Sequence, residues 1–214
     1  MRALIEKSNR FMEIPLGIGP RTLLLSSFLL LAPCYLFSLY DMTMFAPQYP
    51  DGLRLHIYSY KLDGGNNGLD VPEVNVLNHY IGMRDLVVDD FTEFKWLPFV
   101  VGAIGLLYLR TAVLGTVGGL VDVLVLNVYF SAFALWSFGY KMYVYGHTLA
   151  PTAAVKVPAF MPPMFGYKQL ANFEVYSYPQ AASYALALST LLLFTAFVFA
   201  WRQQDRRTGS QESR

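Results

Sequence analysis

Long hydrophobic stretches without charge constrain this chain more than any other feature of its sequence. Residues 22–40 and 181–201 contain no Asp, Glu, Lys or Arg, and residues 97–139 contain only Arg110 and Asp122. A bilayer core about 30 Å thick requires roughly 20 apolar helical residues to cross it. We therefore predict an integral membrane protein. The low content of charged residues agrees with this prediction, since 14% of residues are charged, against about a quarter in a soluble domain.

The middle stretch, residues 97–139, is long enough for two crossings. It contains the run Gly115-Thr-Val-Gly-Gly119, which favours a tight turn because glycine tolerates positive φ. We interpret the stretch as two helices, 97–114 and 120–139, with Arg110 and Asp122 paired near one membrane face. The alternative is one long helix with a re-entrant piece.

Basic residues at the two ends of the chain predict its orientation. Residues 1–21 and 202–214 each carry four Lys or Arg, whereas residues 41–96 carry four basic among nine acidic residues. Positive charge favours the cytoplasmic side, so both termini are expected there and the number of spans is even. The predicted fold class is an all-α integral membrane protein, a four-transmembrane-helix bundle with a small irregular α+β exoplasmic cap. The predicted segments are a cytoplasmic N-terminus 1–21, spans 22–40, 97–114, 120–139 and 181–201, exoplasmic segments 41–96 and 140–180, a cytoplasmic turn 115–119 and a cytoplasmic tail 202–214.

The two exoplasmic segments contain their own structural signals. Residues 53–57 alternate apolar and polar side chains, which is typical of a half-buried strand. Asp70 with Pro72 predicts a helix start with an N-cap carboxylate, and the helix would bury Val74, Leu77 and Ile81 on one face. Residues 141–180 contain five prolines, so we expect an irregular segment that drapes over the first one. The similar strings IYSY (57–60) and VYSY (175–178) either pair as strands or are alike by chance.

Histidine and methionine provide the most specific chemical signal. All three histidines and six of the eight methionines fall in the predicted exoplasmic segments. Thioether is a soft ligand that selects Cu(I), and imidazole also suits copper. The candidate metal ligands are His79, Met83, Met42, Met44 and His147. The competing interpretation is that methionine fills irregular apolar gaps and histidine forms hydrogen bonds at the membrane rim.

Other classes of site and partner find little support in the sequence. A net charge of +1 argues against a nucleic-acid partner, since binding by counterion release needs a basic surface. Cys34 is the only cysteine, so an intramolecular disulfide and any CxxC site are excluded. No nucleotide-binding or metalloprotease motif occurs. We therefore name no catalytic residue and expect a protein that is not an enzyme.

Several strings resemble a family of small bacterial inner-membrane proteins. They are MFAPQYPDGL (44–53), VLNHYIGM (76–83), FKWLPF (94–99), YGHTLAPTAAVKV (145–157) and KQLANF (168–173). Proteins of that family are encoded beside the atypical, Sec-exported nitrous oxide reductase and its copper-supply and ABC-transporter accessory proteins. The resemblance runs from about Ile14 to Trp201 and implies a multi-pass protein of the bacterial inner membrane. It implies a role in maturing or supplying a periplasmic copper enzyme, or in passing electrons towards it.

Two functions follow as expectations. The first is an accessory membrane protein that supports a periplasmic copper enzyme involved in denitrification, with copper bound at the histidine and methionine residues named above. The second is a structural, non-catalytic subunit of a larger membrane complex. The expected partners are the lipid bilayer and other membrane or periplasmic proteins, and not nucleic acid.

Overall fold

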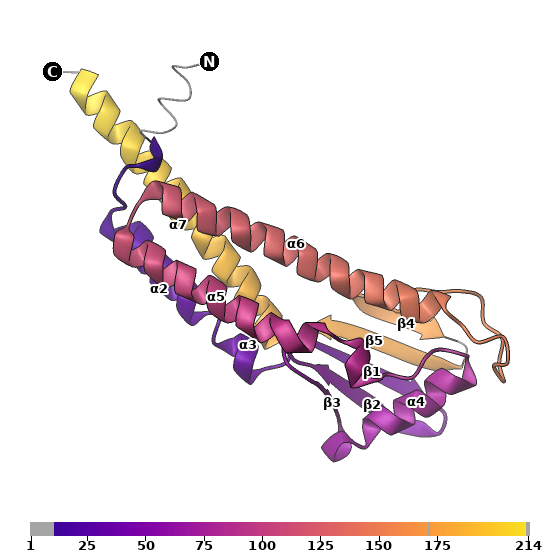
Figure 1. The fold of residues 1–214 in the computed structure, drawn as a ribbon. Coiled ribbons are helices and arrows are strands. Elements are labelled where there is room, and N and C mark those ends of the chain that lie inside the picture. Colours follow the sequence, from indigo (N-terminus) through magenta and orange to yellow (C-terminus); the bar gives the residue numbers. More distant parts are fainter. Residues whose placement is uncertain (1–10, 171, 213–214) are drawn as a thin grey trace. The chain divides into compact units, whose positions relative to one another are not determined.

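The structure is a computed structural model that describes residues 11–170 and 172–212, with side chains described as far as Gln203. The chain divides into two units, and Figure 1 shows the elements of each. The helical unit consists of Met1–Ala32, Phe99–Ser131 and Ala185–Arg214. The sheet unit consists of Pro33–Pro98 and Ala132–Tyr184.

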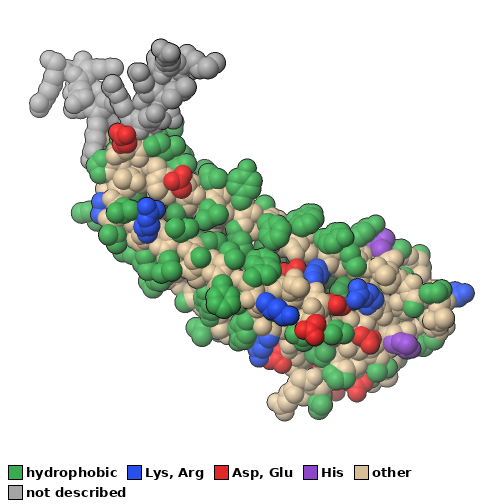
Figure 2. Space-filling view, in the orientation of Figure 1, with side chains coloured by type: hydrophobic (Ala, Val, Ile, Leu, Met, Phe, Trp, Pro, Cys, Tyr) green, Lys and Arg blue, Asp and Glu red, His purple; other side chains and the backbone are tan. Residues whose placement is uncertain are grey.

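Four helices are long and apolar enough to cross a membrane, which makes this a membrane protein by length and composition. Helix α2 (Ile18–Leu29) and the short α3 (Pro33–Leu36) make up the first, and α5 (Glu93–Leu114), α6 (Val117–His147) and α7 (Ala181–Glu212) contain the others. Many outward side chains of the helical unit are apolar, such as Leu106 at 67% exposed and Val113 at 75%. In Figure 2 hydrophobic side chains cover the visible face along these helices, while charged side chains gather over the sheet unit.

The turn between α5 and α6 is held by Arg21. Its guanidinium donates to the carbonyl oxygens of Leu16 at 3.2 Å and Val113 at 3.4 Å. Gly115 has a φ of 63° and allows this approach, because a Cβ there would meet the Arg21 side chain. Arg110 and Asp122 are both exposed and form no ion pair with each other among the described residues. The predicted ion pair across the turn is therefore wrong, since Arg21 closes the turn from α2.

Side-chain hydrogen bonds connect the helices inside the helical unit. The Tyr108 hydroxyl donates to Asn127 Oδ1 at 2.7 Å, and Asn127 Nδ2 donates to Thr190 Oγ1 at 2.8 Å. Ser27 and Ser189 each donate to the other's carbonyl oxygen, at 3.2 and 3.0 Å. Because lipid offers no hydrogen-bond partners, such bonds hold neighbouring helices together.

The sheet unit contains a five-stranded antiparallel sheet of order β3-β2-β1-β5-β4. Its strands are β1 (Tyr40–Ala46), β2 (Tyr49–Ile57), β3 (Leu62–Gly64), β4 (Gly166–Leu170) and β5 (Phe173–Pro179). The predicted strand at 53–57 is confirmed as part of β2. The IYSY and VYSY strings do not pair, because β1 lies between β2 and β5.

Helix α4 (Asp70–Tyr80) covers part of one face of the sheet, between two short 3-10 turns at Asn66–Gly68 and Val88–Asp90. Val74 and Leu77 of this helix and Ile81, which follows its last residue, are buried as predicted. The predicted N-cap is wrong, since the Asp70 carboxylate accepts hydrogen bonds from the backbone N–H of Arg54 and from Asn66 Nδ2. Asp70 thereby joins the helix to the sheet instead of capping its own helix.

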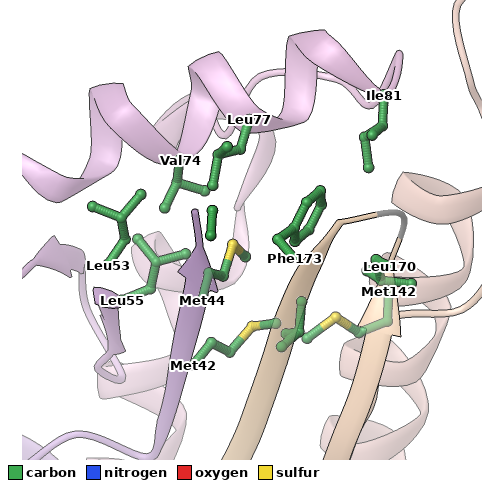
Figure 3. Packing of buried hydrophobic residues seen from close by; sticks show 12 residues of the cluster. Met42, Met44, Leu53, Leu55, Val74, Leu77, Ile81, Met142, Leu170 and Phe173 are labelled. Carbon is green, nitrogen blue, oxygen red and sulfur yellow. The ribbon is translucent and has the colours of Figure 1, made fainter. Parts of the chain in front are cut away.

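The C-terminal part of α6 also packs against the core of the sheet unit. An α-helix rises about 1.5 Å per residue, so the 31 residues of α6 exceed the roughly 20 that a bilayer needs. Its later turns bring Phe138 and Met142 to the core of the sheet unit. Figure 3 shows this core, with α4 on one side and residues of β1, β2 and the β4–β5 hairpin on the other.

The proline-rich segment between α6 and β4 follows α4 and α6 closely. Backbone N–H groups of Ala150 and Phe160 donate to the carbonyl oxygens of Gly82 at 2.7 Å and Gly146 at 3.0 Å. Both glycines make room for it, because a Cβ on Gly82 would lie 2.9 Å from the Ala150 oxygen and one on Gly146 only 1.9 Å from the Phe160 oxygen. The segment is irregular, as expected from its prolines.

The all-α fold class is wrong, because the protein combines four candidate spans with a five-stranded sheet. The prolines explain the error. They predicted an irregular segment up to residue 180, yet four of the five lie before Gly166 and Pro179 is the last residue of β5. The sequence between them supplies two strands that complete the sheet.

Candidate functional site

The predicted methionine ligands Met42 and Met44 lie in the core of the sheet unit. Both are on β1, 6% and 5% exposed, and face the same side as the other buried residues of the sheet. Met142 is also buried, while Met83, Met161 and Met164 are partly buried against the same cluster. All six methionines expected outside the membrane therefore share one hydrophobic core, as their gap-filling interpretation predicts.

The structure does not bring His79 and Met83 together on one helical face. Helix α4 ends at Tyr80, and Gly82 turns the chain with a φ of 79°. Met83 then donates its backbone N–H to the Asn78 oxygen and packs against the core, whereas His79 is exposed. The expected i, i+4 relation requires a helix through residue 83, which the glycine prevents.

His147 lies at the C-terminal end of α6 and is exposed. Its Nδ1 is 2.9 Å from the Tyr143 oxygen, and its ring stacks on the Tyr143 ring at 3.8 Å between centroids. Both predicted histidine ligands are thus on the surface, while Met42 and Met44 are buried. Within the described ranges no group of three His, Cys, Asp or Glu side chains could hold a metal ion.

The second face of the sheet presents aromatic side chains that sequence reasoning missed. Strand residues that alternate with the buried ones point to this face, and those described in the sheet unit are exposed or half-exposed. We call it the open sheet face. Its aromatic residues are Phe45 on β1, Tyr176 and Tyr178 on β5, Tyr167 on β4 and Phe165 just before β4.

These aromatic rings contact one another across three strands. Tyr176 lies opposite Tyr167, with ring centroids 5.0 Å apart, and meets Phe45 edge to face at 5.7 Å. Tyr178 meets Phe165 edge to face at 5.4 Å. Gly52 leaves room for the Phe45 ring, which lies within 2.7 Å of where a Cβ would be. The rings therefore form two contacting groups on the same face, and Tyr176 of one group and Tyr178 of the other are alternate residues of β5.

Charged groups on the same face are mostly paired. His56 Nδ1 lies 2.9 Å from Asp41 Oδ1 across β2 and β1. Lys61 forms an ion pair with Asp63, and its hydrogen bond holds the pKa of that carboxyl below its usual range. The Tyr176 hydroxyl donates to Glu174 at 3.1 Å, and this bond raises the pKa of the phenol.

Arg54 is the exception among these charges. It projects from β2 on the open sheet face, opposite Thr43 in the row that continues to Tyr176 and Tyr167. It is exposed, and among the described residues its guanidinium forms no ion pair or hydrogen bond. A free arginine beside a tyrosine surface is a composition that protein interfaces favour.

A signal for the open sheet face was present in the sequence. Residues 41–44 alternate polar and apolar side chains, and continuing this period of two along residues 41–45 and 174–178 places Phe45, Tyr176 and Tyr178 opposite the buried set. Residue types alone indicate metal ligands but carry no information about this register. Only the pairing of β1 with β5 reveals that the aromatic residues of distant segments lie on the same face.

Neither the protein-family models, the curated proteins nor the solved structures contain a match for this chain.

Proposed function

We propose that this chain is a non-catalytic accessory protein that holds a partner protein at the surface of a bacterial inner membrane. Four apolar helices anchor the chain, and the open sheet face binds the partner. The observation that carries this proposal is the aromatic side chains gathered on the open sheet face, Phe45, Tyr176, Tyr167, Tyr178 and Phe165.

The aromatic surface favours a protein as the partner. Tyrosine and arginine are enriched among residues that dominate binding energy, and a few such residues carry most of it. Phe165 and Tyr167 are 70% and 50% exposed, a large apolar area for a face that would otherwise meet only water. Burial of these rings against a folded surface removes that area from water.

The charges of the open sheet face define the chemistry of the partner. The acidic groups Asp41, Asp63 and Glu174 have partners within the sheet unit, and Arg54 has none among the described residues. A carboxylate on the partner, placed within an apolar surface, would pair with Arg54. An arginine–carboxylate pair is bidentate and fixes orientation as well as affinity.

The distribution of charge supports an exoplasmic position for the sheet unit. Its two sequence segments carry few basic residues, while both chain termini are basic, as the positive-inside rule requires of a protein with cytoplasmic termini. The sequence resemblance then suggests a periplasmic copper enzyme as the partner, with maturation or docking of that enzyme as the role.

A site-specific photocrosslinker tests the proposal in intact cells. It is placed at Tyr178 on the open sheet face or, as a matched control, at Tyr80 on α4, since both side chains are 42% exposed. We expect one periplasmic copper protein to crosslink at position 178 and not at position 80. Equal adducts at both positions, or none at 178, would overturn the proposal.

Charge reversal provides a second measurement on the same complex. Arg54→Glu should reduce recovery of the crosslinked partner at least tenfold, because a like-charge pair replaces the expected ion pair. Lys95→Glu, which reverses a 72% exposed side chain that is outside the sheet, should leave it unchanged. A purely structural subunit of a membrane complex would instead crosslink from Leu106 in α5 to another membrane protein.

A further inference from the structure

The core of the sheet unit contains a buried hydroxyl without a partner. Ser177 on β5 is 0% exposed, and its Oγ has no hydrogen-bond partner in the described structure. A buried hydroxyl that is left unsatisfied is costly, and such a group in a native protein needs an explanation. The side chains around Ser177 therefore indicate what could bind its hydroxyl oxygen.

One methionine lies opposite Ser177 on the neighbouring strand, and a second belongs to the same hydrophobic core. Met42 is the residue directly opposite Ser177 on β1, and directly opposite residues on one face have Cβ atoms about 5 Å apart. Gly166 is opposite on the other side and contributes no side chain. Figure 3 shows the thioether ends of Met42 and Met142 turned toward one another within the same core.

A third thioether lies beside Met142. Met164 Sδ is 3.2 Å from the position that a Cβ on Gly139 would occupy. Gly139 and Met142 are three residues apart on α6 and so lie on the same side of that helix. Met164 therefore packs against α6 at Gly139, on the side of the helix that carries Met142, and both Met161 and Met164 are partly buried against the core.

We propose that Met42, Met142 and Met164 form a buried binding site for Cu(I), with the Ser177 hydroxyl oxygen as a weaker fourth donor. Soft thioethers select Cu(I) over the harder divalent ions. The ion gives the Ser177 oxygen a partner that the protein does not supply. The site is on the opposite face of the sheet from the docking surface, so it does not depend on the proposed partner.

This set of ligands differs from the one that residue types suggested. His79 and His147 are on the surface and take no part, and Met44 projects between Leu53 and Val175 under α4. Thioethers do not titrate, whereas imidazole becomes protonated near its usual pKa of about 6.5. Affinity for Cu(I) should therefore be the same at pH 7 and pH 5, which no histidine site would show.

The experiment measures Cu(I) affinity of the full-length protein in detergent under reducing, anaerobic conditions. Competition with a chromophoric Cu(I) chelator is compared for wild type, Met42→Leu, Met142→Leu and Met164→Leu. Leucine keeps volume and apolarity, so the fold should persist, and circular dichroism of each variant checks this. We expect one bound Cu(I) in wild type and at least a tenfold loss of affinity in each variant.

Two controls separate the site from methionine content and from surface histidines. Met44→Leu alters an equally buried thioether of the same strand, and His79→Ala removes the exposed imidazole, so neither should change affinity. X-ray absorption of the copper-loaded protein should show sulfur and no imidazole nitrogen. Wild-type affinity in the three leucine variants, nitrogen ligation, or no stoichiometric Cu(I) would each overturn the site, and none of these results bears on the photocrosslinking of the open sheet face.

Discussion

Gly146 of α6 is the position where one methyl group should have the largest effect on the sheet unit. A Cβ there would be 1.9 Å from the carbonyl oxygen of Phe160 and 2.8 Å from its carbon. Carbon and oxygen approach no closer than about 3.3 Å even in weak C–H···O contacts. Gly146→Ala therefore forces backbone to move by more than 1 Å (3.3 minus 1.9), and no side-chain rotation relieves the contact.

The magnitude follows from what that movement breaks. The Phe160 N–H donates to the Gly146 oxygen at 3.0 Å, and a typical hydrogen bond contributes about 1 kcal/mol. Phe160 and Met161 pack against the core, and their partial exposure costs about 1–3 kcal/mol. Alanine recovers about 1 kcal/mol of helix propensity. We expect attachment of the proline-rich segment to weaken by about 1–3 kcal/mol.

Gly139→Ala is the matched control, since it makes the same substitution in the same helix. Its Cβ would meet only the Sδ and Cε atoms of Met164, at 3.2 and 3.4 Å. A methionine end rotates easily, so this variant should be neutral or slightly more stable. The pair isolates the backbone contact from the change in helix propensity.

Limited trypsin digestion in detergent measures the attachment directly. Lys156 is exposed in the proline-rich segment, and cleavage after it follows the population of the opened segment when opening is fast. Gly146→Ala should raise the cleavage rate at Lys156 about tenfold, which corresponds to about 1.4 kcal/mol, and Gly139→Ala should not. Wild-type cleavage in Gly146→Ala, or an equal rise in both variants, would refute the close approach of Phe160 to α6.

Two further predictions concern single hydrogen bonds. Asn127→Leu removes the hydrogen bonds to Tyr108 and Thr190. At about 0.6 kcal/mol for each bond within a membrane, the variant should destabilise the helical unit by about 1 kcal/mol. Thermal unfolding in detergent measures this loss, with the exposed Val128→Leu as control. The hydrogen bond from the Tyr49 hydroxyl to Glu73 raises the pKa of the phenol, so its contribution to stability is present below the ordinary pKa near 10 and is lost as pH rises through the raised value. The phenolate absorbance that Tyr49→Phe removes should therefore appear above pH 10, and Glu73→Ala should lower its midpoint; an unchanged midpoint would contradict the bond.

The helices and the local elements of the first exoplasmic segment were predictable because each is encoded by a contiguous pattern. Apolar length alone indicated the four candidate spans, and period-two and helical spacing indicated the strand around Leu55 and the buried face of α4. Lys141 ended the third predicted span by hydropathy, yet α6 continues to His147. Hydropathy indicates where the apolar span ends, but α6 continues because its later turns pack against the core of the sheet unit.

The sheet could not be assembled from the sequence because its pairings join distant segments. Strand β1 begins at Tyr40, the last residue of the predicted first span, and continues into the predicted exoplasmic segment, where no strand was predicted for residues 41–46. Once β1 is known to lie between β2 and β5, alternate residues of each strand can be assigned to the buried face or to the open sheet face. The prolines before Gly166 led to the prediction of an irregular segment where β4 and β5 follow. Proline density argues against a strand only where the prolines themselves lie.

Strand register also explains why the metal ligands suggested by residue types differ from the ligands proposed from the structure. Spacing along the chain related His79 to Met83 and Met42 to Met44, but strand alternation gives Met42 and Met44 the same buried face and a glycine turn takes Met83 off the helix. Whether side chains from distant segments lie close together depends on which strands pair. The pairing of β1 with β5 puts Met42 opposite Ser177, and α6 contributes Met142 to the same core. The histidines named as ligands are therefore on the surface and the thioethers are in the core. The proposed Cu(I) site accordingly has sulfur ligands and no imidazole nitrogen.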